Sequence, residues 1–316
     1  MLTRRLLLAS AAAIAFAAPA FAQDKLNVIA TFSILGDIVQ NVGGDRVEVT
    51  TLVGPDGDAH VFQPAPADAQ AVAGADVIVA NGLGFEGWMD RLVEASGTKA
   101  TIITASEGVT PRAFEEEGHD HAEGEDHDHA EEEAGHDHDH GGQDPHAWQS
   151  VANVEIYVGN IERGLTAADP EGAETYKANA AAYMAELQAV DAEIKAAIAA
   201  LPEDRRTIVT SHDAFGYFGD AYGMTFKAPQ GISTESEASA ADVAALITQI
   251  RDEKIPAVFM ENISDPRLLD QIAAETGAKV GGTLYSDALS GPEGPAGTYL
   301  TMMRYNIGQL TAALGQ

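Results

Sequence analysis

Short apolar runs rich in β-branched residues alternate along the chain with stretches in which apolar residues recur every three or four positions. The runs predict strands and the periodic stretches predict helices. In the first part of the chain, strands are expected over 26–31, 47–53, 76–81 and 99–104, and helices over 34–44, 67–75 and 85–95. The alternation resumes with strands over 206–211, 224–229, 257–262 and 278–284, and helices over 240–254, 266–276 and 298–314. Strand–helix alternation at this spacing is typical of βαβ units, so we predict an α/β protein with parallel sheets.

Between these two alternating regions the pattern is almost entirely helical. It runs from about Asn153 to Ala200, with an interruption at Asp169-Pro170, and its second half is rich in Ala, Glu, Lys and Leu. A continuous helix of about 28 residues would be about 42 Å long at about 1.5 Å per residue, which is longer than one small domain needs. We therefore predict two parallel-sheet α/β lobes joined by one long rigid helix.

The predicted elements divide the chain into four parts. Residues 1–22 are interpreted as a secretory signal, because an Arg pair precedes an apolar run that ends in Ala-Phe-Ala, and this predicts export to the periplasm. Residues 23–158 are expected to form the N-terminal lobe, 159–202 the linking helical segment, and 203–316 the C-terminal lobe. Within the N-terminal lobe, residues 113–142 have no periodicity and extreme charge, so we expect a disordered loop there.

Charge and composition exclude several classes of partner and ligand. The formal net charge is −31, and removal of the signal with its two arginines makes it −33 (−31 − 2). Such acidity disfavours nucleic acid and anionic membranes, so we expect no nucleic-acid partner. The chain has no cysteine, which leaves imidazole and carboxylate as the ligands for any transition metal.

The histidines fall into two groups. Seven of the ten lie in a stretch rich in Asp and Glu, at His119, His121, His127, His129, His136, His138 and His140. Imidazoles at i and i+2 can hold a metal ion together, but a disordered loop must lose conformational entropy to do so. We therefore expect this stretch to be an accessory site that binds metal weakly, with a purely solubilising acidic loop as the alternative.

The other three histidines and one aspartate occupy similar places in the predicted fold. His60 and His212 each follow a predicted strand, and His146 lies where the charged loop returns to the fold. Asp287 follows the predicted strand that ends at Leu284. Open α/β sheets place their ligand sites at such strand ends.

A series of motifs surrounds these four positions. They are DAHVFQPAPAD, NGLGFEGW, DPHAW, DPEGAETYKANAAAYMAEL, TSHDAFGYFGDAYGM, STESEASAADV, FMENISDPR and LYSDALS. In this order they resemble the periplasmic metal-binding components of zinc and manganese ABC importers, over about 26–314 without the charged loop. DAHVFQP departs from the more usual D-P-H-x-Y-x-P of that family. The resemblance implies a metal site in the cleft between two lobes, with His60, His146, His212 and Asp287 as ligands, and a membrane permease as partner.

The third ligand position distinguishes the metals in this family. It is His in zinc-type members and a carboxylate in manganese-type members, and here it is His212. Three neutral imidazoles and one carboxylate also suit four-coordinate Zn²⁺ chemically, whereas manganese favours more oxygen ligands. We therefore predict a high-affinity zinc receptor that is not an enzyme, with a manganese-type receptor as an alternative. Glu261 is expected behind the ligands, where it would orient an imidazole, with a metal ligand and a residue that merely ends its strand as the alternatives.

An exported zinc hydrolase is the alternative from another class of protein. Catalytic zinc keeps one position open for water, so a site of three histidines without Asp287 would suit it, with Glu261 as base. The sequence contains no H-E-x-x-H motif that would favour this reading. We expect the receptor to be a monomer that works with the permease. A metallochaperone that donates zinc is a further candidate partner.

Overall fold

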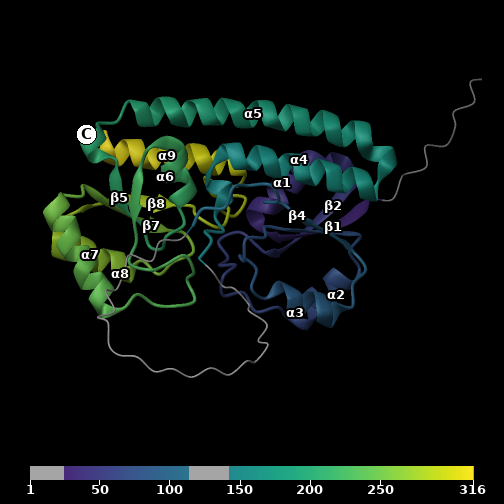
Figure 1. The fold of residues 1–316 in the computed structure, drawn as a ribbon, viewed down its shortest axis with the longest axis horizontal. Coiled ribbons are helices and arrows are strands. Elements are labelled where there is room, and N and C mark those ends of the chain that lie inside the picture. The colour runs from purple at the N-terminus through teal and green to yellow at the C-terminus, as the bar shows by residue number, and fades with distance from the viewer. Residues whose placement is uncertain (1–24, 114–141, 316) are drawn as a thin grey trace, which may run out of the picture.

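The computed structural model describes residues 25–113 and 142–315, in which the chain forms two four-stranded parallel sheets beneath a layer of long helices (Figure 1). The predicted α/β class with two parallel-sheet lobes is confirmed. The predicted signal over 1–22 and all seven histidines between His119 and His140 lie outside the described residues. Across the part of the chain that the structure describes, no helix has the length and apolar character needed to cross a membrane.

The N-terminal lobe is built on a sheet with the strand order β2-β1-β3-β4. β3 is buried along its whole length and β1 along most of it, as expected for a parallel sheet that is covered on both faces. The elements of this lobe are β1 Leu26–Phe32, α1 Ser33–Gly43, η1 Gly44–Arg46, β2 Val47–Val53, α2 Pro66–Ala73, β3 Val77–Ala80, α3 Met89–Ser96 and β4 Thr101–Thr104.

One predicted helix of this lobe begins later than expected. The apolar pattern predicted a helix over 85–95, but α3 begins only at Met89. The residues before it form a tight turn, in which the carboxylate of Glu86 accepts the main-chain N–H groups of Asn81 and Gly82. These hydrogen bonds of the Glu86 side chain to the backbone of the turn override the local helical pattern.

The C-terminal lobe repeats the arrangement of the first. Its strand order is β6-β5-β7-β8, so in both sheets the second strand of the lobe lies outside the first, and the third and fourth follow on the other side. All pairs within both sheets are parallel. The elements are η4 Glu203–Arg205, β5 Thr207–Val209, α6 Gly216–Tyr222, β6 Thr225–Lys227, α7 Ala240–Glu253, β7 Ala257–Glu261, α8 Arg267–Thr276, β8 Lys279–Leu284 and α9 Tyr299–Leu314.

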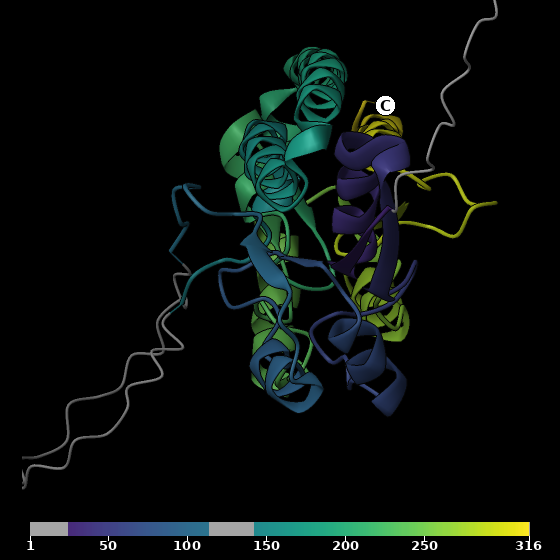
Figure 2. The ribbon, with the colours of Figure 1, turned by 90° about the vertical axis from the view of Figure 1, so that its right-hand side faces the viewer.

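Two antiparallel helices connect the lobes. α4 (Val151–Ala168) and α5 (Ala173–Ala199) are joined by the short η3 (Pro170–Gly172), and they lie side by side along one edge of the molecule (Figures 1 and 2). α5 has 27 residues, or about 40 Å, and contacts α1 in one lobe and α9 in the other, so the predicted long connecting helix is confirmed. Its buried side chains recur at intervals of three and four and form one stripe: Tyr176, Ala180, Tyr183, Leu187, Val190, Ile194 and Ile198.

The larger hydrophobic core continues from the N-terminal sheet through α4 and α5 to α9. The C-terminal sheet has one face in this core and the other in a smaller cluster under α7 and α8. β7 shows the division directly, because side chains alternate along a strand. Ala257 and Phe259 belong to the larger core, while Val258 and Met260 belong to the smaller one.

Candidate metal centre

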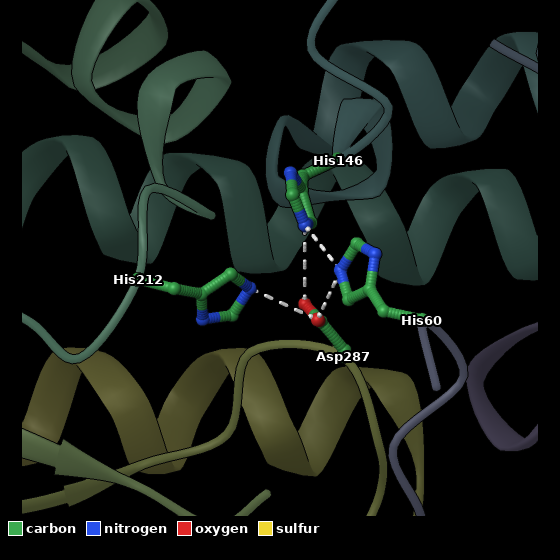
Figure 3. A group of neighbouring side chains, drawn as sticks. All are labelled: His60, His146, His212 and Asp287. Carbon is green, nitrogen blue, oxygen red and sulfur yellow. Dashed lines mark hydrogen bonds and ion pairs between the residues drawn. The ribbon is translucent and has the colours of Figure 1, made fainter. Parts of the chain in front are cut away.

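Four side chains from both lobes converge between the two sheets (Figure 3). His60 comes from the loop after β2, and His146 from the segment that leads into the short η2 (Ala147–Gln149) and α4. His212 follows β5 and Asp287 follows β8. The three histidines and the aspartate predicted from the sequence are thus brought together, and one ligand atom from each lies within 4.8 Å of all the others.

The separations between these atoms fit a small coordination sphere. Nε2 of His60 lies 3.3 Å from Nε2 of His146 and 3.1 Å from Oδ2 of Asp287. Nε2 of His212 lies 3.1 Å from the same oxygen, and Nε2 of His146 lies 3.7 Å from Oδ1. A tetrahedron with metal–ligand bonds of about 2.0–2.2 Å has edges of about 3.3–3.6 Å. The four groups therefore need only small shifts to surround one ion.

Burial and charge make this cluster suited to a cation. Burial alone would lower the pKa of His146, but the Asp287 and Asp144 carboxylates outweigh it and raise that pKa to about 9. The pKa of His212 is likewise raised well above its ordinary value, against the effect of burial, by Glu261 and Asp287. Burial acts to raise the pKa of Asp287, yet the two imidazoles hold it well below its usual range. The buried carboxylates thus require positive charge beside them, which a divalent cation would supply in place of protons.

Two imidazoles are held from behind by carboxylates. Nδ1 of His146 lies 2.8 Å from Oδ1 of Asp144, and Nδ1 of His212 lies 2.6 Å from Oε2 of Glu261. The other oxygen of Glu261 accepts the main-chain N–H groups of Ser211 and His212, which fixes the carboxylate in this position. Such contacts at Nδ1 leave Nε2 facing the centre and increase the basicity of the ring.

Asp144 was not among the residues singled out from the sequence. It stands two positions before His146, and Asp58 stands two positions before His60 in the same way. The repeated D-x-H spacing is the signal in the sequence that could have identified both aspartates.

Hydrogen bonds across the lobes set the position of Asp287. The indole N–H of Trp148 and the side-chain amide of Gln149 both donate to the main-chain oxygen of Ser286, at 2.9 and 2.7 Å. The Trp148 ring also contacts the His146 ring, with centroids 5.2 Å apart. The segment that carries His146 is therefore tied directly to the residue before Asp287.

The glycine-rich turn of the N-terminal lobe supports the same segment. The side-chain amide of Asn81 donates to the main-chain oxygen of Pro145, and its carbonyl accepts from the hydroxyl of Tyr157. Asn81 and Tyr157 are both fully buried. The turn therefore acts as a support for the residue next to His146.

Two parallel α/β lobes linked by a long helix, with a buried cluster of imidazoles and a carboxylate between them, define the class of metal-binding receptors that serve ABC importers. The sequence comparison agrees, because a family model described as zinc-uptake complex component A, periplasmic (ZnuA), matches residues 28–313. The chain belongs to this family.

Relatives of the chain are named for several metals. The manganese-binding lipoprotein MntA of Halalkalibacterium halodurans is 33% identical over 293 residues, covering 93% of this chain and 90% of that protein. The iron-binding protein YfeA of Yersinia pestis is 34% identical over 310 residues, covering 98% and 93%. Among solved structures, the periplasmic zinc-binding protein TroA of Treponema pallidum matches with a TM-score of 0.81 at 29% identity, covering 92% of this chain and 99% of that one. The manganese-bound periplasmic metal-binding protein of Candidatus Liberibacter asiaticus matches with a TM-score of 0.77 at 33% identity, covering 92% and 100%.

Proposed function

We propose that this protein is a periplasmic receptor that binds Zn²⁺ through His60, His146, His212 and Asp287 and delivers it to the membrane permease of an ABC importer. The observation that carries the proposal is the convergence of three imidazoles and one carboxylate in a buried site. One ligand atom from each lies within 4.8 Å of all the others, and four of the pairs are separated by 3.1–3.7 Å. A complete set of four protein ligands is suited to holding an ion tightly. Zinc is the cargo of this site.

The choice of zinc rests on the donor atoms. Three imidazoles and one carboxylate suit Zn²⁺, and zinc lies above manganese in the general order of affinity. The manganese-type receptor is the second candidate, because the relatives include proteins named as manganese-binding. His212 is the group on which the two candidates differ, since a carboxylate in its place would give manganese a further oxygen ligand.

The hydrolase alternative requires an open coordination position and a base beside it. The Asp287 carboxylate lies 3.1 Å from two of the imidazoles and so takes the fourth corner. Glu261 contacts Nδ1 of His212, on the side of the ring away from Nε2, and its other oxygen is held by main-chain N–H groups. Both contacts support a receptor, because neither an open corner nor a free base faces the centre.

Export and partners complete the proposal. The N-terminal signal over 1–22 supports secretion to the periplasm, and several relatives are named as lipoproteins. We propose that the receptor works as a monomer with the permease, and that a zinc-donating metallochaperone is a candidate source of the ion. The histidine stretch over 119–140 is proposed as an accessory site of weaker affinity.

The test compares Asp287→Ala with Asp252→Ala, which removes an exposed aspartate of α7 and serves as the matched control. Both variants and the unmodified protein are stripped with a chelator, and zinc affinity and thermal shift are measured. We expect Asp287→Ala to weaken zinc binding by at least about tenfold, or about 1.4 kcal/mol, while the control is unchanged. Equal affinity in all three proteins, together with zinc-dependent hydrolysis of esters or phosphoesters, would overturn the receptor in favour of the hydrolase.

A further inference from the structure

The two histidine ligands of the N-terminal lobe are each preceded by an aspartate that makes the same hydrogen bond. In Asp58-Ala59-His60 and in Asp144-Pro145-His146, an aspartate stands two residues before the histidine. In both cases Oδ1 of the aspartate accepts the main-chain N–H of that histidine at 2.9 Å. This bond fixes the backbone from which each imidazole projects, so the position of each ring depends on the orientation of one carboxylate.

The second oxygen of each aspartate makes a contact that leads to the C-terminal lobe. Oδ2 of Asp58 accepts the hydroxyl of Thr234, which lies between β6 and α7, at 2.6 Å. Oδ2 of Asp144 lies 3.5 Å from Nη1 of Arg112, whose Nε donates to Asp220 on α6 at 3.1 Å. Each carboxylate therefore spans from a ligand's backbone to a group set by the other lobe.

Arg112 belongs to the N-terminal part of the chain but is held against α6. Its main-chain N–H donates to the hydroxyl of Tyr217 at 2.9 Å. A Cβ atom placed on Gly216 would lie 2.5 Å from the Arg112 guanidinium and 2.6 Å from Oδ2 of Asp144, so a glycine is needed for this approach. The main-chain oxygen of Arg112 also accepts the N–H of Asp144 at 2.9 Å. A shift of α6 is thus passed directly to Asp144.

A third bond between the lobes lacks this connection. The side-chain amide of Asn262 donates to Oδ1 of Asp56 at 3.0 Å. Asp56 contacts the C-terminal lobe again through its main-chain N–H, which donates to Leu289. None of the hydrogen bonds described for Asp56 leads to His60 or His146, although its partner Asn262 also donates to the main-chain oxygen of Ala288, next to Asp287. Asp56 therefore offers a comparison in which the lobes are joined without a link to the two N-terminal histidines.

We infer that Asp58 and Asp144 are positioning residues that make retention of the ion depend on the position of the C-terminal lobe. Asp58 contacts that lobe through Thr234, and Asp144 contacts it through the Arg112–Asp220 pair. This inference rests on the proposed function. When the segment around Thr234 or α6 shifts, Oδ2 loses its partner, the carboxylate turns, and the backbone N–H of the ligand is released. The imidazoles of His60 and His146 then lose their fixed orientation, and the ion dissociates faster.

The experiment measures association and dissociation rates of Zn²⁺ by rapid mixing with a chromophoric chelator, using the full exported chain. Thr234→Val removes the hydroxyl donor at nearly constant volume, and Thr234→Ser restores it. Asp220→Ala removes the far end of the arginine bridge at a residue whose side chain is 68% exposed, so folding is not threatened. Asp56→Gly is the matched control, since Asp56 has a φ of 55°, which glycine adopts freely.

We expect Thr234→Val to raise the dissociation rate about tenfold with an unchanged association rate, the size expected for loss of a hydrogen bond to a charged group. Asp220→Ala should raise it by about threefold, because an ion pair with an exposed carboxylate contributes less. Thr234→Ser should return to within about twofold of the unmodified protein. The inference is overturned if both variants dissociate at the rate of Asp56→Gly, or if Thr234→Ser fails to restore retention. The proposed function fails separately, if the unmodified protein binds no zinc at the four ligands.

Discussion

A carboxylate at the contact between α1 and α9 makes stability depend on pH. Oδ2 of Asp37 accepts the main-chain N–H of Tyr299, the first residue of α9, at 2.8 Å. Burial raises the pKa of Asp37 from 3.8 to about 6, although this hydrogen bond acts in the opposite direction. The ionised side chain therefore destabilises the folded protein. Asp37→Asn keeps an oxygen that can accept the same bond and removes the charge.

The sign and size of the effect follow from the two pKa values. Between pH 4 and 6 the folded state holds this proton more firmly than the unfolded state, so stability falls as pH rises through that window and is level above it. A difference of about 2 units corresponds to about 3 kcal/mol at pH 7.5, as an upper value because the side chain keeps some contact with solvent. At pH 4.5 the same calculation leaves about 1 kcal/mol. Asp37→Asn should therefore stabilise the protein at pH 7.5 and much less at pH 4.5.

The assay is urea unfolding of the chelator-treated protein, followed by circular dichroism at both pH values. Asp252→Asn, at an exposed position of α7, controls for a general change in net charge. The reasoning is refuted if Asp37→Asn is less stable than the unmodified protein at pH 7.5, or if its advantage is the same at both pH values.

Three further predictions concern the metal. His212→Glu should narrow the preference for Zn²⁺ over Mn²⁺ because it replaces an imidazole with oxygen ligands, and a competition titration in which the unmodified protein prefers Mn²⁺ would contradict the zinc assignment. Deletion of 115–141 should remove only weaker zinc binding, as counted by equilibrium dialysis; loss of the tight class would make the histidine stretch the primary site. Zinc affinity should fall as pH falls, with more than one proton taken up per ion released, and constant affinity between pH 7.5 and about 5.5 would argue against three imidazole ligands.

The alternation of strands and helices was sufficient to predict the two sheets, because parallel strands buried on both faces have a strong apolar signal. It failed for the start of α3, where Glu86 binds the backbone of Asn81 and Gly82 instead of continuing a helix. Side-chain hydrogen bonds to the backbone, like these of Glu86, leave no trace in the apolar periodicity.

The candidate site was predictable only in part. The position of His60 after a strand was visible locally, but its partner Asp287 is 227 residues away, and only the resemblance to a family joined the two. The bridge from Asp144 through Arg112 to Asp220 was missed, because its contacts span 32 and 108 residues and depend on how the lobes pack. Residue types and strand ends identify the ligands and Glu261 behind His212, whereas a bridge made of contacts between the lobes requires the three-dimensional structure.

The unbroken core beneath α5 limits how this receptor can give up its ion. A wide hinge motion would expose buried side chains of α5, which pack in a core that extends into both lobes. Exposure of even three or four large apolar side chains costs about 5–10 kcal/mol. Loops at the strand ends can move without exposing these core side chains. Release of the ion is therefore expected to involve only local movement of the loops around the metal site. The permease must then distinguish a loaded receptor by small differences in a few surface segments rather than by a change in overall shape.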